Sequence, residues 1–220
     1  MNADMLLLRQ GAKLLGIELT DKQLALFDVY QNELRHWNAK TNLISENTSG
    51  EIVTRHFLDS LTAYKFIINQ KARIVDMGSG AGFPGIPLKI ALPSLQLYLL
   101  ETHRKKVSFL KHIIRTLNLH QTQTLHDRSE NIIQSETWRG KFDVVISRAS
   151  LKLPDLLSLG QYFLAPDGLL ITLKGAEISS EWNAAMTDSN TTKKYQLYQY
   201  DINMPFLGPP RKIIVAQKAK

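Results

Sequence analysis

The chain has 220 residues, and 44 % of them are hydrophobic, which is enough to build one substantial core. It contains no cysteine, so disulfides, cysteine-ligated zinc, iron–sulfur clusters and cysteine nucleophiles are excluded. The formal net charge of +7 predicts a polyanionic partner, because lysine and arginine gain free energy by displacing counterions from phosphates. The opening MNADMLLLRQ has too short an apolar run for a signal peptide or a membrane span, so we expect a cytoplasmic protein with no membrane partner.

Helical patterns dominate residues 1–70, which we expect to form a helical N-terminal extension. Thr20 and Gln23 fit a capping box at the start of one helix. Behind them, apolar residues recur at helical spacing, and we expect Trp37 to lie in the core rather than to stack on a base. A further helix is predicted over residues 49–64. The apolar stripe of the first helix consists of Leu24, Phe27, Tyr30, Leu34 and Trp37.

From residue 71 onward, short apolar segments alternate with helical patterns, which predicts a parallel sheet covered by helices on both faces. Ligands of such sheets bind beyond the carboxyl ends of the strands. The tail predicts an antiparallel hairpin, in which YQLYQYDI and KIIVAQ flank the turn MPFLGPP. We therefore expect residues 71–220 to form one compact α/β domain. The predicted strands are RIVD, LYLLE, QTLH, FDVVIS and GLLITLK.

A glycine-rich segment, VDMGSGAGFPG at residues 75–85, coincides with the end of the first predicted strand. Its glycines allow a sharp turn and let a ligand approach the backbone, as in nucleotide-binding sites. A phosphate-binding P-loop is excluded, because Gly85 is followed by Ile86 and Pro87 instead of Lys and Ser or Thr. A glycine-rich turn without a ligand remains an alternative. The residues expected to shape a ligand site here are Asp76, Gly78, Gly80 and Gly82.

Two ligands fit this loop. Gly80, Gly82 and Gly85 have the G-x-G-x-x-G spacing of dinucleotide-binding proteins, with Glu101 placed to bind a ribose. S-adenosylmethionine is favoured, because Asp76 can meet its ammonium group, whereas the same carboxylate would repel a pyrophosphate. Glu101 ends the second predicted strand, where its carboxylate can accept hydrogen bonds from both ribose hydroxyls; the alternative is a solvated acid.

The segment GSGAGFPGIPL resembles motif I of class I S-adenosylmethionine-dependent methyltransferases. Together with RHFLDSL at 55–61, ISRAS at 146–150 and the C-terminal RKIIVAQK, it resembles the small-subunit ribosomal RNA guanine-N7 methyltransferase family, formerly called glucose-inhibited division protein B. The resemblance begins at about Trp37. It implies a class I α/β fold, Rossmann-like with a seven-stranded, mostly parallel sheet and a helical N-terminal extension. It also implies S-adenosylmethionine as cofactor and methylation of one guanine in 16S ribosomal RNA of the small ribosomal subunit.

Arg148, in ISRAS, ends the fourth predicted strand, beside the point where donor and acceptor must meet. Its guanidinium is always charged and cannot act as a general base, but it can orient the donor's carboxylate or a phosphate through paired hydrogen bonds. It is our candidate catalytic residue, and the alternative is a salt bridge to Asp76 or Asp143. The resemblance implies a donor site that uses Gly78, Phe83, Ser129, Glu130 and Arg148.

The sequence also narrows the acceptor atom. Methylation of pyrimidine C5 usually needs a cysteine nucleophile, which the chain lacks. Methylation of an exocyclic amine usually goes with an Asn/Asp-Pro-Pro-aromatic motif, but Ser147, Arg148 and Ala149 occupy that place. Guanine N7 has a free lone pair and needs no general base, so we expect weak pH dependence. Catalysis then depends on alignment and on drawing the base out of its stack.

A basic helix is predicted at RKKVSFLKHIIRTL, where Arg and Lys but no acid lie opposite an apolar stripe. This face either binds RNA or is merely solvated. The resemblance and the strand-end rule place further cations near the site, although Asp59 could simply pair with His56. The six histidines have no metal-ligand spacing, so no metal is expected. The RNA-binding candidates are Arg55, His56, Arg104, Lys105, Lys174 and Arg211.

Three functions stay open at this point. The motifs favour a 16S ribosomal RNA guanine-N7 methyltransferase, the glycine spacing permits an NAD-dependent oxidoreductase, and the charge permits a noncatalytic RNA-binding protein with a methyltransferase-like fold. Thermal stabilisation by S-adenosylmethionine but not by NAD would favour the first, because a ligand that binds only the native state raises its apparent stability.

Overall fold

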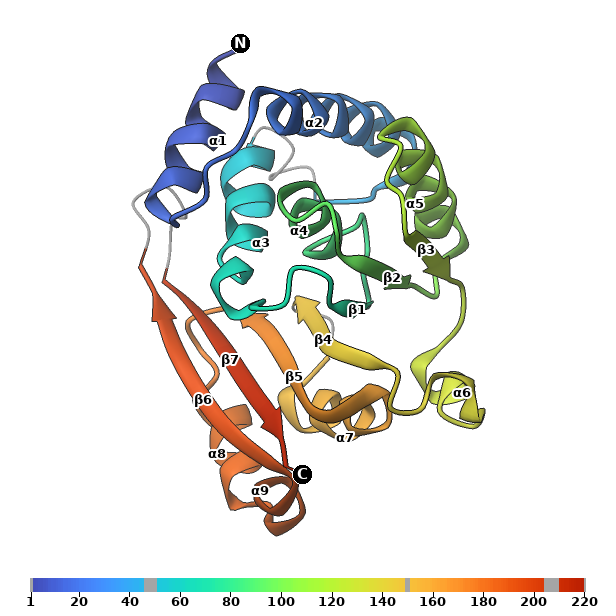
Figure 1. Cartoon of the computed structure of the whole chain (residues 1–220), viewed down its shortest axis with the longest axis vertical. Coiled ribbons are helices and arrows are strands. Elements are labelled where there is room, and N and C mark those ends of the chain that lie inside the picture. Colours follow the sequence, from blue (N-terminus) through green and yellow to red (C-terminus); the bar gives the residue numbers. More distant parts are fainter. Residues whose placement is uncertain (1, 46–50, 149–150, 204–209, 220) are drawn as a thin grey trace.

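A central sheet of seven strands organises the protein (Figure 1), and its strand order is β3-β2-β1-β4-β5-β7-β6. The computed structural model describes residues 2–45, 51–148, 151–203 and 210–219. Neighbouring strands are parallel except around β7, which runs antiparallel to both β5 and β6. The predicted seven-stranded, mostly parallel sheet is therefore confirmed. The strands are β1 (Arg73–Met77), β2 (Gln96–Leu100), β3 (Thr122–Leu125), β4 (Phe142–Arg148), β5 (Leu164–Lys174), β6 (Tyr195–Ile202) and β7 (Arg211–Lys218).

Helices cover both faces of this sheet, so successive strand residues enter two different cores. In β1, Ile74 joins the core under α1, α2, α4 and α5, whereas Val75 joins the core under α7 and α8. This two-sided burial explains the near-continuous apolar strands. The helices before the sheet are α1 (Ala3–Leu14), α2 (Asp21–Thr41), the π-helix η2 (Val53–Leu58), α3 (Asp59–Leu61) and the 3₁₀ turn η3 (Tyr64–Phe66). Those after β1 are α4 (Gly85–Ala91), α5 (Arg104–Thr116), α6 (Ser129–Ile132), η4 (Glu136–Trp138), α7 (Leu153–Phe163), α8 (Ser179–Thr187) and α9 (Ser189–Lys194).

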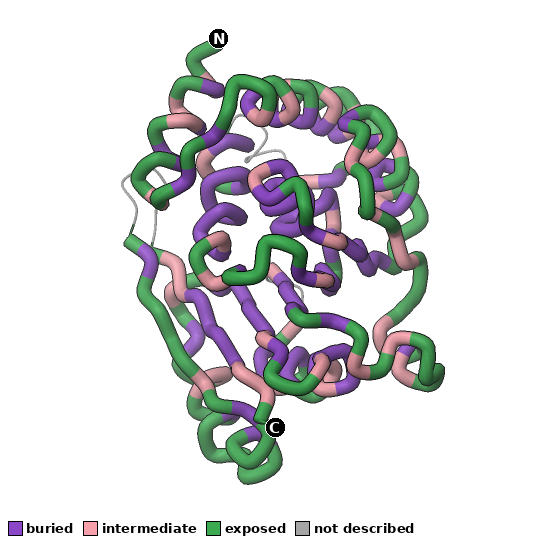
Figure 2. The backbone as a smooth tube through the Cα atoms, in the orientation of Figure 1, coloured by how far each residue is buried: buried purple, intermediate pink, exposed green. Residues whose placement is uncertain are grey.

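Helix α2 packs directly on the glycine-rich loop. It begins with the predicted capping box of Thr20 and Gln23. The first four residues of its stripe are buried, and Tyr30 donates a hydrogen bond of 2.6 Å from its hydroxyl to the carbonyl of Ala81. Trp37 is half-buried, with its ring 5.6 Å from that of Phe109. Figure 2 shows the inner side of the N-terminal helices buried and the outer side of α2 largely exposed. The N-terminal helices thus share one core with the sheet.

The helix predicted over residues 49–64 is different in the structure. Its first two residues, 49 and 50, lie outside the described residues, and the segment continues as η2, α3 and the start of η3. Hydrophobic periodicity does not separate a π-helix from an α-helix over so short a stretch. The segment is also buried on nearly all sides, since His56, Asp59 and Ser60 are buried together with its apolar residues. It is therefore an internal element rather than a surface helix.

The predicted C-terminal hairpin is confirmed by the antiparallel pairing of β6 with β7. Its predicted turn MPFLGPP falls largely on residues 204–209, outside the described residues. None of the helices in the described residues is long and apolar enough to cross a membrane.

Candidate functional site

The loop after β1 adopts a conformation that glycine favours. Gly78, Gly80 and Gly82 have φ angles of +70°, +59° and +101°, in the left-handed region. The amides of Gly78 and Ser79 both donate to the carbonyl of Leu100, at 2.9 and 3.0 Å. The loop is therefore tied to the end of β2, and its backbone lies open to a ligand at the carboxyl edge of the sheet.

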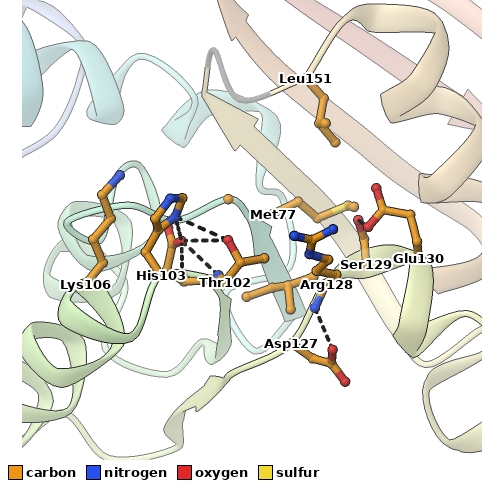
Figure 3. A pocket seen from close by; sticks show the side chains of 12 residues that line it. Met77, Thr102, His103, Lys106, Asp127, Arg128, Ser129, Glu130 and Leu151 are labelled. Atoms are coloured by element: carbon orange, nitrogen blue, oxygen red, sulfur yellow. Dashed lines mark hydrogen bonds and ion pairs between the residues drawn. The ribbon is translucent and has the colours of Figure 1, made fainter.

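A cavity of about 460 Å³ lies at this edge, beyond the carboxyl ends of β1, β2 and β3. Four of the predicted donor-site residues line it, namely Gly78, Glu101, Ser129 and Glu130. Figure 3 shows His103 and Lys106 on one side of this donor cavity and Ser129 and Glu130 on the other. Its volume and its mixed polar and apolar walls suit a small organic cofactor.

Glu101 is the fixed anion of the donor cavity. Its Oε2 accepts from the amide of Gly80 at 2.9 Å, and its Oε1 accepts from the amides of Thr102 and His103, both at 2.8 Å. Burial raises the pKa of Glu101, but the hydrogen bonds from His103 and Gly80 outweigh it, so the pKa is lowered overall. The carboxylate is thus ionised and oriented at neutral pH. The ring of His103, to which the sequence assigned no role, also lies here, with Nδ1 2.9 Å from Oε1.

Asp76 lies beneath the loop instead of on the cavity wall. It is fully buried, and its Oδ2 accepts from the amide of Gly85 at 2.8 Å. Its Oδ1 has no hydrogen-bond partner among the described residues. Burial raises the pKa of Asp76 to about 7, although the Gly85 amide and the guanidinium of Arg148 act in the opposite direction. The contact of Asp76 with a ligand ammonium stays a prediction.

Gly82 and Phe83 also lie away from the donor cavity. A Cβ atom on Gly82 would come within 2.8 Å of the Tyr30 hydroxyl, so only glycine lets the loop pack on α2. The ring of Phe83 is buried and stacks on His56, with a centroid distance of 4.7 Å. The guanidinium of Arg148 lies 4.9 Å from the centroid of the same ring. Phe83 therefore connects the loop to a second cavity.

This second cavity, of about 220 Å³, lies between η2 and the ends of β4, β5 and β7. Because β7 is antiparallel, its first residue, Arg211, lies at the same edge of the sheet as Arg148 and Lys174, which end β4 and β5. Arg104 and Lys105 lie elsewhere, at the exposed start of α5 next to the donor cavity residue Lys106. The predicted RNA-binding residues that line this cation-lined cavity are Arg55, His56, Lys174 and Arg211.

Arg148 is held by three groups of one helical segment. Its Nη1 donates to the carbonyl of Arg55 at 3.0 Å and to Oδ2 of Asp59 at 3.2 Å, and its Nη2 donates to Nδ1 of His56 at 2.8 Å. The predicted partners Asp76 and Asp143 were wrong. Asp143 lies near the opposite end of β4, where it accepts from a backbone amide of β1.

His56 accepts this hydrogen bond as a neutral ring. Burial lowers the pKa of His56 to about 3, and the positive charge of Arg148 adds to the effect. Since arginine only donates, Nδ1 must be the acceptor and the ring proton lies on Nε2. The predicted direct pairing of His56 with Asp59 is thus replaced by a shared arginine.

The two cavities flank the junction of β1 and β4, where successive connections leave the sheet in opposite directions. Open α/β sheets bind ligands at such a switch point. Together with the backbone cradle at Gly78 and the buried acid at the end of β2, this arrangement fits S-adenosylmethionine. The fold and the site define a class I S-adenosylmethionine-dependent methyltransferase.

Comparison with known proteins identifies the family. The protein TYW2 of M. jannaschii, solved in complex with AdoMet, has a TM-score of 0.55 over 73 % of this chain and 75 % of its own, at 20 % identity, which shows the fold. The family of rRNA small subunit methyltransferase G matches residues 23–205. Ribosomal RNA small subunit methyltransferase G of Syntrophus aciditrophicus is 40 % identical over 97 % of this chain and 89 % of its own. The protein of that name from Geotalea uraniireducens is 38 % identical, over 96 % and 95 %.

The chain therefore belongs to the rRNA small subunit methyltransferase G family. The resemblance seen in its motifs is confirmed, and the oxidoreductase and noncatalytic alternatives lose their support.

Proposed function

We propose that the protein transfers a methyl group from S-adenosylmethionine to N7 of one guanine in 16S ribosomal RNA of the small ribosomal subunit. The family supports the reaction and the RNA class. The observation that carries the proposal for this chain is the pair of cavities at one edge of the sheet, one built around a fixed carboxylate and the other lined by cations. We further propose that the protein acts in the cytoplasm, where ribosomal subunits are modified.

The donor cavity supplies binding groups for S-adenosylmethionine, whose sulfonium carries the methyl group to be transferred. Glu101 accepts hydrogen bonds from the ribose hydroxyls, since a carboxylate keeps acceptor capacity beyond the three backbone amides that hold it. Gly78 lets the ligand approach the backbone. Ser129 and Glu130 border the wall opposite His103 and Lys106. We expect them to contact the adenine.

The second cavity supplies the acceptor site. Arg148 lines this cavity and lies against the ring of Phe83 from the donor loop, so Arg148 can orient a substrate group next to the methyl group. Neither ionisable neighbour of Arg148 acts as a general base: Nδ1 of His56 is occupied by Arg148, and Asp59 contacts two guanidiniums. Guanine N7 needs no base, because its lone pair is free, and the site therefore fits this acceptor. Arg55, His56, Lys174 and Arg211 line the RNA site, and Arg104 and Lys105 extend it along α5.

The test is to incubate the protein with labelled S-adenosylmethionine and small ribosomal subunits that lack the modification, then to digest the RNA and identify the labelled nucleoside. Label in N7-methylguanosine at one position supports the proposal. Arg148→Ala is expected to lower the rate at least about a hundredfold, as for loss of a group that aligns reactants. Label in another nucleoside would reject the acceptor atom, and absence of label despite donor binding would reject the substrate.

A further inference from the structure

Asp59 is a buried carboxylate that joins two arginines from distant parts of the chain. It is 4 % exposed. Its Oδ2 lies 3.2 Å from Nη1 of Arg148, at the end of β4, and its Oδ1 lies 3.4 Å from Nε of Arg211, at the start of β7. Each oxygen thus faces a different guanidinium, and both guanidiniums line the cation-lined cavity.

The other two cations of this cavity have acidic partners of their own. Arg55 pairs with Glu51 one turn earlier in the same helical segment. Lys174 lies 3.0 Å from Glu181 of α8 and donates to the carbonyl of Leu151 at 2.5 Å. Among the ion pairs of the described residues, Arg148 and Arg211 share Asp59 as their carboxylate partner, so this pair of guanidiniums carries one more charge than the carboxylate between them. A phosphodiester group carries one negative charge.

Geometry adds to this charge balance. Arg148 is fixed by the Arg55 carbonyl, the His56 ring, Asp59 and the face of Phe83, and its side chain is 18 % exposed. Nε of Arg211 is buried and faces Asp59 as an ion pair without a hydrogen bond, and the side chain is 30 % exposed, so its exposed area lies on atoms other than Nε. Planar guanidiniums held by a carboxylate form a rigid donor set, the arrangement that suits phosphate oxygens.

We propose that Asp59 is a positioning residue, which holds Arg148 and Arg211 as a pair of guanidiniums for one phosphodiester group of the acceptor RNA strand. This inference rests on the proposed function, because it takes RNA as the ligand of the cavity. Asp59 acts through the two arginines and contacts neither the methyl donor nor the target base.

The direction in which Asp59→Asn changes RNA affinity distinguishes a positioning role of Asp59 from a purely electrostatic one. Asp59→Asn removes a negative charge next to two cations, so electrostatics alone would make RNA bind more tightly. If Asp59 positions the arginines, RNA binds more weakly instead, by about tenfold or more, because the guanidiniums lose their fixed geometry. A purely structural role would lower the melting temperature and leave the affinity of the folded protein unchanged.

The measurement is the dissociation constant of the full-length protein for 16S ribosomal RNA at fixed salt. Affinity for S-adenosylhomocysteine is measured in parallel and is expected to stay within about twofold of wild type. Asp201→Asn is the matched control, because it removes a carboxylate from the exposed pair with Lys212, 2.7 Å apart on the neighbouring strands. This control is expected to leave RNA affinity unchanged or slightly higher. Unchanged or tighter RNA binding by Asp59→Asn would overturn the inference.

Arg211→Lys gives an independent test if Asp59→Asn fails to fold. It keeps the charge on a partly exposed side chain but loses the planar fork. RNA affinity is expected to fall nearly as far as in Arg211→Ala, and wild-type affinity in Arg211→Lys would overturn the inference. A wild-type protein that binds the RNA without methylating it would reject the proposed function, while the sign of the Asp59→Asn effect would still decide the inference.

Discussion

Asp76, at the start of the donor loop, is a carboxylate in an unfavourable environment for its charge. It is fully buried, and one of its oxygens has no hydrogen-bond partner among the described residues. Burial raises its pKa from 3.8 to about 7. The folded protein therefore holds this proton more tightly than the unfolded chain does. The stabilisation that results is fully present below pH 3.8 and is lost as the pH rises through about 7.

Asp76→Asn is neutral at every pH and removes this dependence. We expect the difference in melting temperature, variant minus wild type, to grow as the pH is raised from about 4 to about 8. Thermal unfolding in a series of buffers measures it. Asp143→Asn makes the same exchange at an exposed site and serves as the comparison. A constant difference for Asp76→Asn would mean that Asp76 ionises in the folded protein as it does in the unfolded chain.

The position relative to the donor cavity could be predicted from the sequence for some residues and not for others. Glu101, Ser129 and Glu130 were predicted at the donor site and line the donor cavity, because their positions after parallel strands determine their location. Phe83 was assigned to the same site, yet its ring turns toward His56. Sequence spacing does not determine which side of a loop a side chain takes, since packing on the N-terminal helices decides it.

The π-helix η2 shows the limit of prediction at the level of elements. Its apolar residues predicted a helix at about the right place, but the pattern could not give its hydrogen-bonding type. The contact of Asp59 with Arg148 joins residues 89 positions apart, and no local pattern reports such a contact. A spacing of three from His56 suggested only a pair on one helix face.

Helix α1 packs tightly on η2 at Gly11, so a Gly→Ala substitution there is expected to change the free energy of unfolding in the direction opposite to the usual one. A Cβ atom on Gly11 would lie 2.4 Å from Cδ1 of Leu58, a fully buried residue of η2. Gly→Ala inside a helix ordinarily stabilises by up to about 1 kcal/mol. We expect Gly11→Ala to destabilise instead, by about 1–3 kcal/mol, because overpacking forces Leu58 out of place.

Urea unfolding, followed by fluorescence, gives the change in free energy. Gly175→Ala is the comparison, because no atom lies within 4 Å of its added Cβ. Stabilisation of the protein by Gly11→Ala would show that α1 shifts easily on η2.

At the scale of the molecule, the parallel sheet and its antiparallel hairpin were the parts most fully accessible to sequence. Alternating strands and helices predicted a parallel sheet, and the tail predicted the antiparallel hairpin that completes it. The consequence that could not be foreseen is that antiparallel β7 begins at the edge where β4 and β5 end, which adds Arg211 to the second cavity.

The net charge of +7 leads to a prediction for the whole molecule. Raising the salt concentration from about 50 to about 200 mM is expected to weaken binding to 16S ribosomal RNA by at least about tenfold, because counterion release contributes less at high salt. Binding of S-adenosylhomocysteine is expected to change little over the same range, since the anchor that we propose for it, Glu101, is one buried carboxylate. Filter binding and calorimetry measure the two affinities. Equal salt dependence of both would argue against a polyanionic acceptor.

The π-helix makes the number of residues in RHFLDSL as important as their identity. Each residue added to or removed from a helix turns everything beyond it by about 100°. His56 and Asp59 reach Arg148 from the same segment, and a change in length between them would point one of the two away from it. Across relatives and in laboratory evolution, this segment is therefore expected to accept conservative substitutions but neither insertions nor deletions. The constraint acts on the length of the segment and not on any single side chain.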